Sequence, residues 1–205
     1  MRLLGQINSP FVRRVAISLE LLQLEFELEP LSLFVDFDAF RAINPVAKAP
    51  TLVLDSGTVL QESSLILQYV ESVLTNGKSL WSAQPDILQW EMHCAGLALA
   101  ACEKSVQLVY EYRLRPEEKR LQSWVDRVLL QLAGAFGELE KAFSATPDAI
   151  NEDASQACIT TAAAWKFLQM TVPHQMKLSD YSALNTLSER MEATPVFRKY
   201  QPEAR

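Results

Sequence analysis

The spacing of apolar residues changes about a third of the way along this chain of 205 residues. Before that point, short alternating runs typical of strands are mixed with helical spacings, whereas the later spacing is almost entirely helical. With 49% hydrophobic residues, the chain can bury either one large core or two smaller ones. The pattern therefore predicts a mixed α/β domain over residues 1–76, a linker over 77–84 and an all-helical domain over 85–205.

The first domain is expected to contain four strands and two regular helices. Ser9 precedes Pro10 at the start of one helix, because serine is a favoured N-cap and proline is tolerated in the first turn. A second helix begins at Ser63, and an irregular helix is expected within residues 35–44. The expected strands cover residues 1–7, 25–29, 51–54 and 58–60, the last two joined by a turn that contains glycine. The order β-α-β followed by β-β-α predicts a thioredoxin-like domain.

The second domain is expected to be a helical bundle. Its apolar stripes favour one helix that begins at Pro85 and ends before Arg115-Pro116, because proline interrupts helices. They favour a second helix from about residue 121 to 143. Two further helices are expected at about 160–170 and 180–193, with a surface loop at 146–155.

Charge and composition exclude several classes of function. The net charge of -6 gives no general attraction for nucleic acid, and no apolar stretch has the length of a membrane span. The three cysteines are odd in number and not closely paired, which fits a reducing compartment. His93 and His174 lie far apart in sequence and no C-x-x-C motif occurs, so neither a metal site nor a dithiol centre is expected. The start of the chain lacks the features of a secretory signal, and the expected location is the cytoplasm.

Three short stretches of the first domain carry the functional expectation. They read S-P-F-V-R at residues 9–13, N-P-V-A-K-A-P-T-L at 44–52 and Q-E-S-S at 61–64. In order and spacing they resemble the three glutathione-contacting segments of the cytosolic glutathione transferases. The similarity covers most of the chain, and among subfamilies it is greatest to small bacterial glutathione transferase-like proteins with an S-P-F-V-R segment. The resemblance implies a homodimer that uses glutathione as co-substrate.

Ser9 is the expected catalytic residue. At the junction of strand and helix its hydroxyl would lie beside unpaired N–H groups, where an anion is favoured. Lowering a thiol pKa by roughly 2 units requires about 2.7 kcal/mol. A hydrogen bond to a charged group contributes ~1.5–3 kcal/mol and a helix N-terminus ~0.3–1 kcal/mol. Ser9 could thus hold the glutathione sulfur as a thiolate; the alternative is that Ser9 only caps the helix.

The other two stretches are expected to bind the rest of glutathione. The resemblance implies that the Ala49-Pro50 bond is cis, so that the backbone of Ala49 pairs with the cysteinyl part. Lys48 would meet the glycyl carboxylate or else lie in solvent. Glu62 and Ser63, at a helix start, suit the ammonium and carboxylate of the γ-glutamyl end, although the same residues also read as an ordinary helix cap.

The second domain is expected to complete the pocket for a small apolar electrophile, with Phe11, Tyr110 and Tyr112 as its wall. A glutathione-dependent thiol transferase or reductase is the nearest enzymatic alternative, but it requires a cysteine at the position of Ser9. A non-catalytic interaction protein of the same fold, similar to stringent starvation protein A, is the alternative from another class.

Overall fold

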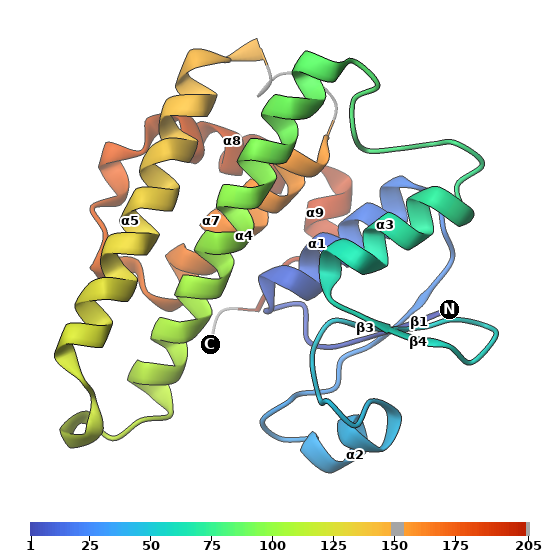
Figure 1. The fold of residues 1–205 in the computed structure, drawn as a ribbon, viewed down its shortest axis with the longest axis horizontal. Helices are drawn as coiled ribbons and strands as arrows, with labels where there is room; N and C mark the ends of the chain where they lie inside the picture. Colours follow the sequence, from blue (N-terminus) through green and yellow to red (C-terminus); the bar gives the residue numbers. More distant parts are fainter. Residues whose placement is uncertain (149–153, 204–205) are drawn as a thin grey trace. The chain divides into compact units, whose positions relative to one another are not determined.

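The computed structural model describes residues 1–148 and 154–203, which fall into two compact units (Figure 1). The N-terminal unit contains Met1–Leu80 together with the segment that starts at Thr194, and the helical unit contains Trp81–Ala193. The sequence pattern groups the last segment with the helical domain. It packs instead on the first helix of the N-terminal unit, because Lys199 and Tyr200 bond to Glu20, and Arg13 donates to the backbone oxygen of Tyr200.

The N-terminal unit is built on a sheet of four short strands in the order β2-β1-β3-β4. β1 is parallel to β2 and antiparallel to β3, which is in turn antiparallel to β4. This mixed sheet confirms the thioredoxin-like prediction, although the first three strands in sequence are shorter than expected and the fourth is shifted by one residue. The strands are β1 (Arg2–Leu4), β2 (Glu27–Glu29), β3 (Thr51–Val53) and β4 (Val59–Gln61).

Helices cover both faces of this sheet, α1 and α3 on one side and α2 on the other (Figure 1). Successive side chains of a strand point to opposite faces. Leu4 and Val53 accordingly form a buried cluster with Phe40 of α2. The irregular helix expected within 35–44 is thus a regular helix of two turns. The helices of this unit are α1 (Pro10–Leu21), α2 (Phe37–Ile43), α3 (Ser63–Val73) and α9 (Pro195–Lys199).

The helical unit is a bundle, as predicted, with Trp165 at its centre. The Trp165 ring packs edge-on against Phe136 at 4.9 Å between centroids, and its indole N–H donates to Asn185. Within the described part of this unit, 3-10 turns lie at Glu117–Lys119, Pro173–Gln175 and Leu178–Asp180. The longer helices are α4 (Pro85–Arg113), α5 (Gln122–Ala145), α7 (Gln156–Thr171) and α8 (Ser182–Glu192).

The start of α7 differs from the prediction, which placed it near Thr160. The helix begins at Gln156, and its N-cap is Ser155, whose side chain accepts a hydrogen bond from the N–H of Cys158. Every residue from Gln156 to Trp165 is buried. A helix that is buried all round has no polar face, so apolar periodicity could not locate its first turn.

Cys94, Cys102 and Cys158 belong to the helical unit, are buried and form no disulfide among the residues that the structure describes. Burial raises the pKa of the Cys94 thiol to about 12, and burial also raises the pKa of Cys158. These two thiols are therefore not thiolates at neutral pH. Across residues 1–148 and 154–203, no helix combines the length and apolar character that crossing a membrane would require.

Candidate functional site

The register of the sheet brings the three predicted stretches to one end of it. Leu4, the last residue of β1, pairs with Thr51, the first residue of β3, and Thr51 pairs with Gln61, the last residue of β4. The chain leaves β1 towards Ser9, enters β3 from Pro50 and leaves β4 towards Glu62. These three residues therefore lie beyond the same end of the sheet, which we call the site end.

Ser9 is the N-cap of α1, with an extended backbone conformation. Its Oγ accepts a long hydrogen bond, 3.4 Å, from the N–H of Val12. A serine hydroxyl that accepts one bond keeps its own proton for another partner. The capping geometry is compatible with Ser9 as a helix cap and with Ser9 as a donor to the glutathione sulfur, since the same hydroxyl can cap the helix and donate to an anion.

Asn44 fixes the second stretch to the sheet, a role that the sequence did not reveal. It is 3% exposed, and its Nδ2 donates to Thr51 Oγ1 at 2.8 Å and to Gln61 Oε1 at 3.1 Å. Its Oδ1 accepts from the N–H of Val46 at 3.0 Å. Asn44 thereby ties the loop to both β3 and the end of β4. An asparagine before proline is a common turn signal, so the local sequence does not predict these hydrogen-bond partners, which lie further along the chain.

The loop from Asn44 to Thr51 contains the Ala49-Pro50 bond, which is cis as the resemblance implied. Ala49 is half-buried, whereas Lys48 is exposed. The carbonyl of Lys48 accepts a hydrogen bond from Thr51 Oγ1 at 2.7 Å. Ala47 has a φ of 49°, a left-handed conformation that favours glycine.

Glu62 caps α3, and its carboxylate lies over the first turn. Its Oε2 accepts from the N–H groups of Ser64 and Leu65 at 3.1 and 3.2 Å. Its φ of 72° is rare for a residue with a side chain, and such strained conformations concentrate at functional sites. A carboxylate held in this way stabilises the helix start and lies at the site end.

Ser63 is the first residue of α3 and is only 1% exposed. Its Oγ accepts a hydrogen bond from Arg14 at 3.0 Å and lies 3.5 Å from Glu62 Oε1, to which it donates. The same Arg14 nitrogen donates to Ser64 Oγ at 3.2 Å. Arg14 belongs to α1 and is 2% exposed. Its place behind the site was not predictable from the sequence, because a second arginine in an amphipathic helix normally lies on the solvent face.

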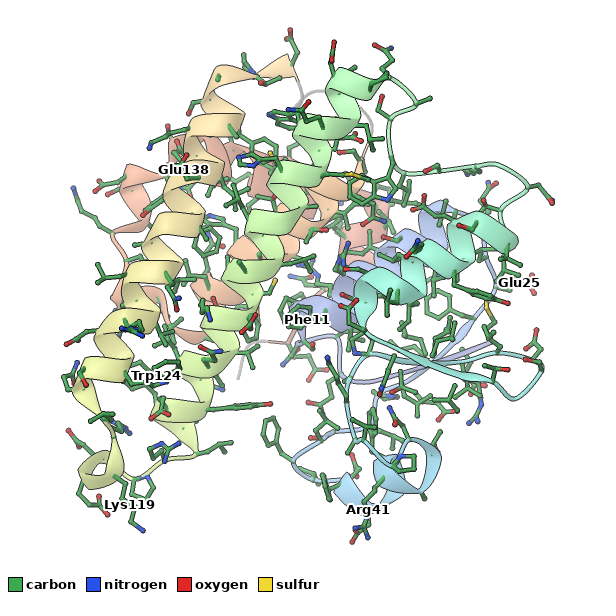
Figure 2. All side chains as sticks on the ribbon, viewed as in Figure 1. Phe11, Glu25, Arg41, Lys119, Trp124 and Glu138 are labelled. Atoms are coloured by element: carbon green, nitrogen blue, oxygen red, sulfur yellow. The ribbon has the colours of Figure 1, made fainter. Side chains whose placement is uncertain are left out.

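The aromatic residues predicted for the electrophile pocket are divided between the two units. Phe11 lies near the start of α1 and is half-buried (Figure 2). Tyr110 is 44% exposed on α4, and the ring of Tyr112 is covered by the guanidinium of Arg120, at 5.4 Å from its centroid. The roles of Phe11, Tyr110 and Tyr112 in substrate binding stay predictions.

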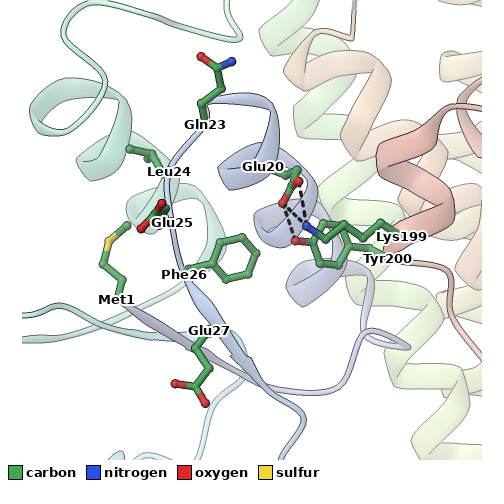
Figure 3. Close-up of a pocket in the computed structure, with 9 residues that line it drawn as sticks. All are labelled: Met1, Glu20, Gln23, Leu24, Glu25, Phe26, Glu27, Lys199 and Tyr200. Carbon is green, nitrogen blue, oxygen red and sulfur yellow. Dashed lines mark hydrogen bonds and ion pairs between the residues drawn. The ribbon is translucent and has the colours of Figure 1, made fainter.

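A separate cleft of about 720 Å³ opens in the N-terminal unit beside β2 and α9 (Figure 3). Glu20 lies on its wall and accepts hydrogen bonds from Lys199 and Tyr200. The ring of Phe26 stacks on Tyr200 with centroids 6.0 Å apart. None of the residues predicted to bind glutathione lines this cleft.

Comparison with known proteins identifies relatives of both units. Residues 3–73 match the family described as "Glutathione S-transferase, N-terminal domain". A probable glutathione S-transferase GSTU6 of Oryza sativa is 30% identical over 149 residues, which make up 69% of this chain and 62% of the rice protein. The match with glutathione S-transferase U3 of Arabidopsis thaliana, 35% identical, covers 39% of this chain and 36% of that protein. The chain thus spans less than two thirds of the length of these curated relatives.

Solved structures match nearly the whole chain, among them two from the glutathione transferase family. A glutathione S-transferase from Methylobacterium radiotolerans, in complex with glutathione sulfonate, has a TM-score of 0.85 at 26% identity. That match covers 100% of this chain and 95% of the other. A glutathione transferase family member from Pseudomonas fluorescens, with bound glutathione, also has a TM-score of 0.85 at 26% identity, over 98% of each chain.

Proposed function

The chain belongs to the cytosolic glutathione transferase superfamily, and on this premise we propose that it binds glutathione at the site end and transfers it to small apolar electrophiles. The observation that carries the proposal is the register of Leu4, Thr51 and Gln61, which gathers Ser9, Pro50 and Glu62 at one end of the sheet. The glutathione bound to the Pseudomonas fluorescens relative gives it independent support.

In the proposed binding mode, each part of glutathione has a partner at the site end. The Ser9 hydroxyl donates to the sulfur, and the backbone of Ala49 beside cis-Pro50 pairs with the cysteinyl part. Glu62 attracts the γ-glutamyl ammonium, and Ser63 donates to the neighbouring carboxylate. Lys48, exposed on the same loop, meets the glycyl carboxylate.

In the proposed reaction, the glutathione thiolate is the nucleophile. Its sulfur forms a bond to the electrophilic carbon, and that carbon releases its leaving group or passes its electron pair to an adjacent activated atom. Ser9 keeps its own proton and stabilises the thiolate by donating a hydrogen bond. Phe11, Tyr110 and Tyr112 are proposed to contact the apolar part of the electrophile.

The chain's own thiols do not suit the rival thiol-transferase chemistry. That reaction needs a reactive cysteine, and a serine occupies the corresponding position at the start of α1. Cys94 and Cys158 are buried with raised pKa values, so they cannot replace it as nucleophiles at neutral pH.

The proposal is tested by assaying conjugation of glutathione to a chromogenic chloronitrobenzene. We expect catalysis above the uncatalysed rate that saturates with glutathione and falls at least tenfold in Ser9→Ala. An interaction protein of the stringent starvation protein A type would give no catalysis and no retention on immobilised glutathione. That pair of negative results would overturn the proposal.

We further propose that the chain works as a homodimer in the cytoplasm. Exposed apolar side chains occur on both units, among them Leu65 on α3, 60% exposed, and Leu130 on α5, 75% exposed. In the proposed dimer, the first domain of one chain packs on the second domain of its partner, which would cover such residues. Sedimentation should give twice the chain mass for the wild type and a single-chain mass for Leu65→Arg. A monomeric wild type would contradict the dimer.

A further inference from the structure

The buried guanidinium of Arg14 lies directly behind the start of α3, at the position where the proposed function places the γ-glutamyl carboxylate. Arg14 Nη1 donates to Ser63 Oγ at 3.0 Å and to Ser64 Oγ at 3.2 Å. Both Arg14 and Ser63 are at least 98% buried, since their exposed fractions are 2% and 1%. The contact therefore joins α1 to the start of α3, two segments far apart in the sequence, within the protein interior.

The direction of this hydrogen bond determines what the Ser63 hydroxyl can do. Arginine has N–H donors and no acceptor, so Ser63 Oγ must accept from Arg14. A hydroxyl has one hydrogen, and in this arrangement that hydrogen points away from Arg14 towards another acceptor. The acceptor in the structure is Glu62 Oε1, at the long distance of 3.5 Å. Such a weak bond is readily replaced by a shorter one to an incoming carboxylate.

We propose that Arg14 is a positioning residue that orients and polarises the Ser63 hydroxyl as a donor to the γ-glutamyl α-carboxylate of glutathione. Arg14 acts through Ser63 and does not touch the ligand. A cation that donates to the oxygen of a hydroxyl strengthens the hydrogen bond that the hydroxyl itself donates, and low local polarity increases this effect. The inference rests on the proposed function, because it assumes that glutathione binds at the site end.

Arg13 provides a matched control in the same helix. It is 1% exposed, and its Nε donates to the backbone oxygen of Tyr200 at 2.9 Å. Its guanidinium also lies over the Phe197 ring at 5.0 Å. Arg13 thus contacts the C-terminal segment at Phe197 and Tyr200, whereas Arg14 contacts the start of α3. Replacing Arg13 removes a buried arginine of α1 with these C-terminal contacts, without removing the Arg14 bonds to Ser63 and Ser64.

The test compares two peptides by calorimetry: glutathione, and γ-aminobutyryl-cysteinyl-glycine, which is glutathione without the γ-glutamyl α-carboxylate. The dissociation constant of the peptide without the carboxylate, divided by that of glutathione, measures how much the carboxylate contributes to binding. We expect the wild type to prefer glutathione by about tenfold or more, which corresponds to 1.4 kcal/mol. Arg14→Met and Ser63→Ala should each bring the ratio to within about twofold of one, and the double variant should show no further loss.

Arg14→Lys keeps a charged donor and should recover part of the preference, while Arg13→Met should keep the wild-type ratio even if it lowers stability. If Arg14→Met does not fold, Arg14→Lys provides the same test. Its ratio of dissociation constants is expected to be lower than that of the wild type but above one. Equal weakening of both peptides in the Arg14 variants would make Arg14 merely structural and would overturn the inference. A wild type that binds glutathione but shows no preference would also overturn it. A wild type that binds neither peptide would instead overturn the proposed function.

Discussion

Gly5 and Ala49 pack so closely that a side chain at position 5 has no room. A Cβ atom built on Gly5 would lie 3.1 Å from the Cβ of Ala49 and 2.6 Å from a methyl group of Val12. The φ of Gly5 is 132°, which residues with side chains rarely adopt. This single glycine therefore allows the end of β1, the start of α1 and the loop before Pro50 to meet at the site end.

Gly5→Ala is expected to lower the free energy of unfolding by about 3 kcal/mol, because backbone strain and steric overlap add together. Gly57→Ala is the matched control, since Gly57 has a φ of 84° but, apart from itself and its two chain neighbours, no residue has an atom within 4 Å of the added Cβ. Gly57→Ala should lower the free energy of unfolding by only about 1 kcal/mol, because it introduces backbone strain without steric overlap. Chemical denaturation of both variants checks the difference. Equal losses would show that close packing at Gly5 has no energetic role.

Ser9→Ala should raise the pKa of the bound glutathione thiol by about 1–2 units, because the sulfur loses a hydrogen-bond donor. Removal of the cap should also lower stability by about 1 kcal/mol. Ser155→Ala removes the corresponding cap of α7 and should cost similar stability without changing the thiol pKa. The thiolate absorbance of the complex, followed against pH, measures this pKa. If Ser9→Ala and Ser155→Ala give the same thiol pKa, Ser9 is only a cap.

Ala47→Gly tests whether the left-handed backbone of the second stretch carries strain. At a φ of 49° glycine avoids the penalty that alanine incurs, so this change should leave stability unchanged or raise it. Ala133→Gly, at an exposed position within α5, should lower stability by about 1 kcal/mol, since glycine disfavours helix. Thermal unfolding should give a lower melting temperature for Ala133→Gly than for Ala47→Gly. Equal destabilisation would contradict the strain at Ala47.

Glu20 should make the attachment of α9 sensitive to acid. The hydrogen bond from Lys199, followed by the one from Tyr200, lowers the pKa of the Glu20 carboxyl below its ordinary value of 4.5. A lowered folded-state pKa means that the stabilisation is complete above 4.5 and is lost as the pH falls through the folded value. Because this pair is largely solvated, its effect should be only a few tenths of a kcal/mol.

The measurement is urea denaturation of the wild type and Glu20→Gln at neutral and acidic pH. The difference between the two proteins should shrink at acidic pH, where the wild-type carboxyl is protonated. Tyr200→Phe removes one donor to Glu20 but keeps the ring beside Phe26, so it should show a smaller pH-dependent loss. A difference independent of pH would contradict the role of the Glu20 charge.

The sequence predicted the parts of the fold that depend on local pattern. Alternation located β2, and the cap-and-proline signal located the start of α1 at Pro10. The start of α7 could not be found in this way, because the helix is buried on all sides. The three candidate stretches were identified by their resemblance, in order and spacing, to the glutathione-contacting segments of the family, because each is a short local motif.

The contacts that hold these stretches in place could not be predicted, because they join residues far apart in the sequence. Arg14 meets Ser63 across 49 positions, and Asn44 meets Gln61 across 17. Neither residue type signals its partner locally: arginine in a helix and asparagine before proline are both common at surfaces. Only the packing of α1 beside α3, and the pairing of β3 with β4, brings these groups together.

The most direct test of the central claim is a calorimetric titration of the wild-type protein with glutathione, repeated on Ser63→Ala. We predict saturable binding of one glutathione per chain, weakened about tenfold when the Ser63 hydroxyl is removed. Thr194→Ala, which removes the N-cap of α9, should bind like the wild type. Absence of binding to the wild type, or an affinity that Ser63→Ala leaves unchanged, would contradict the claim that glutathione binds at the site end.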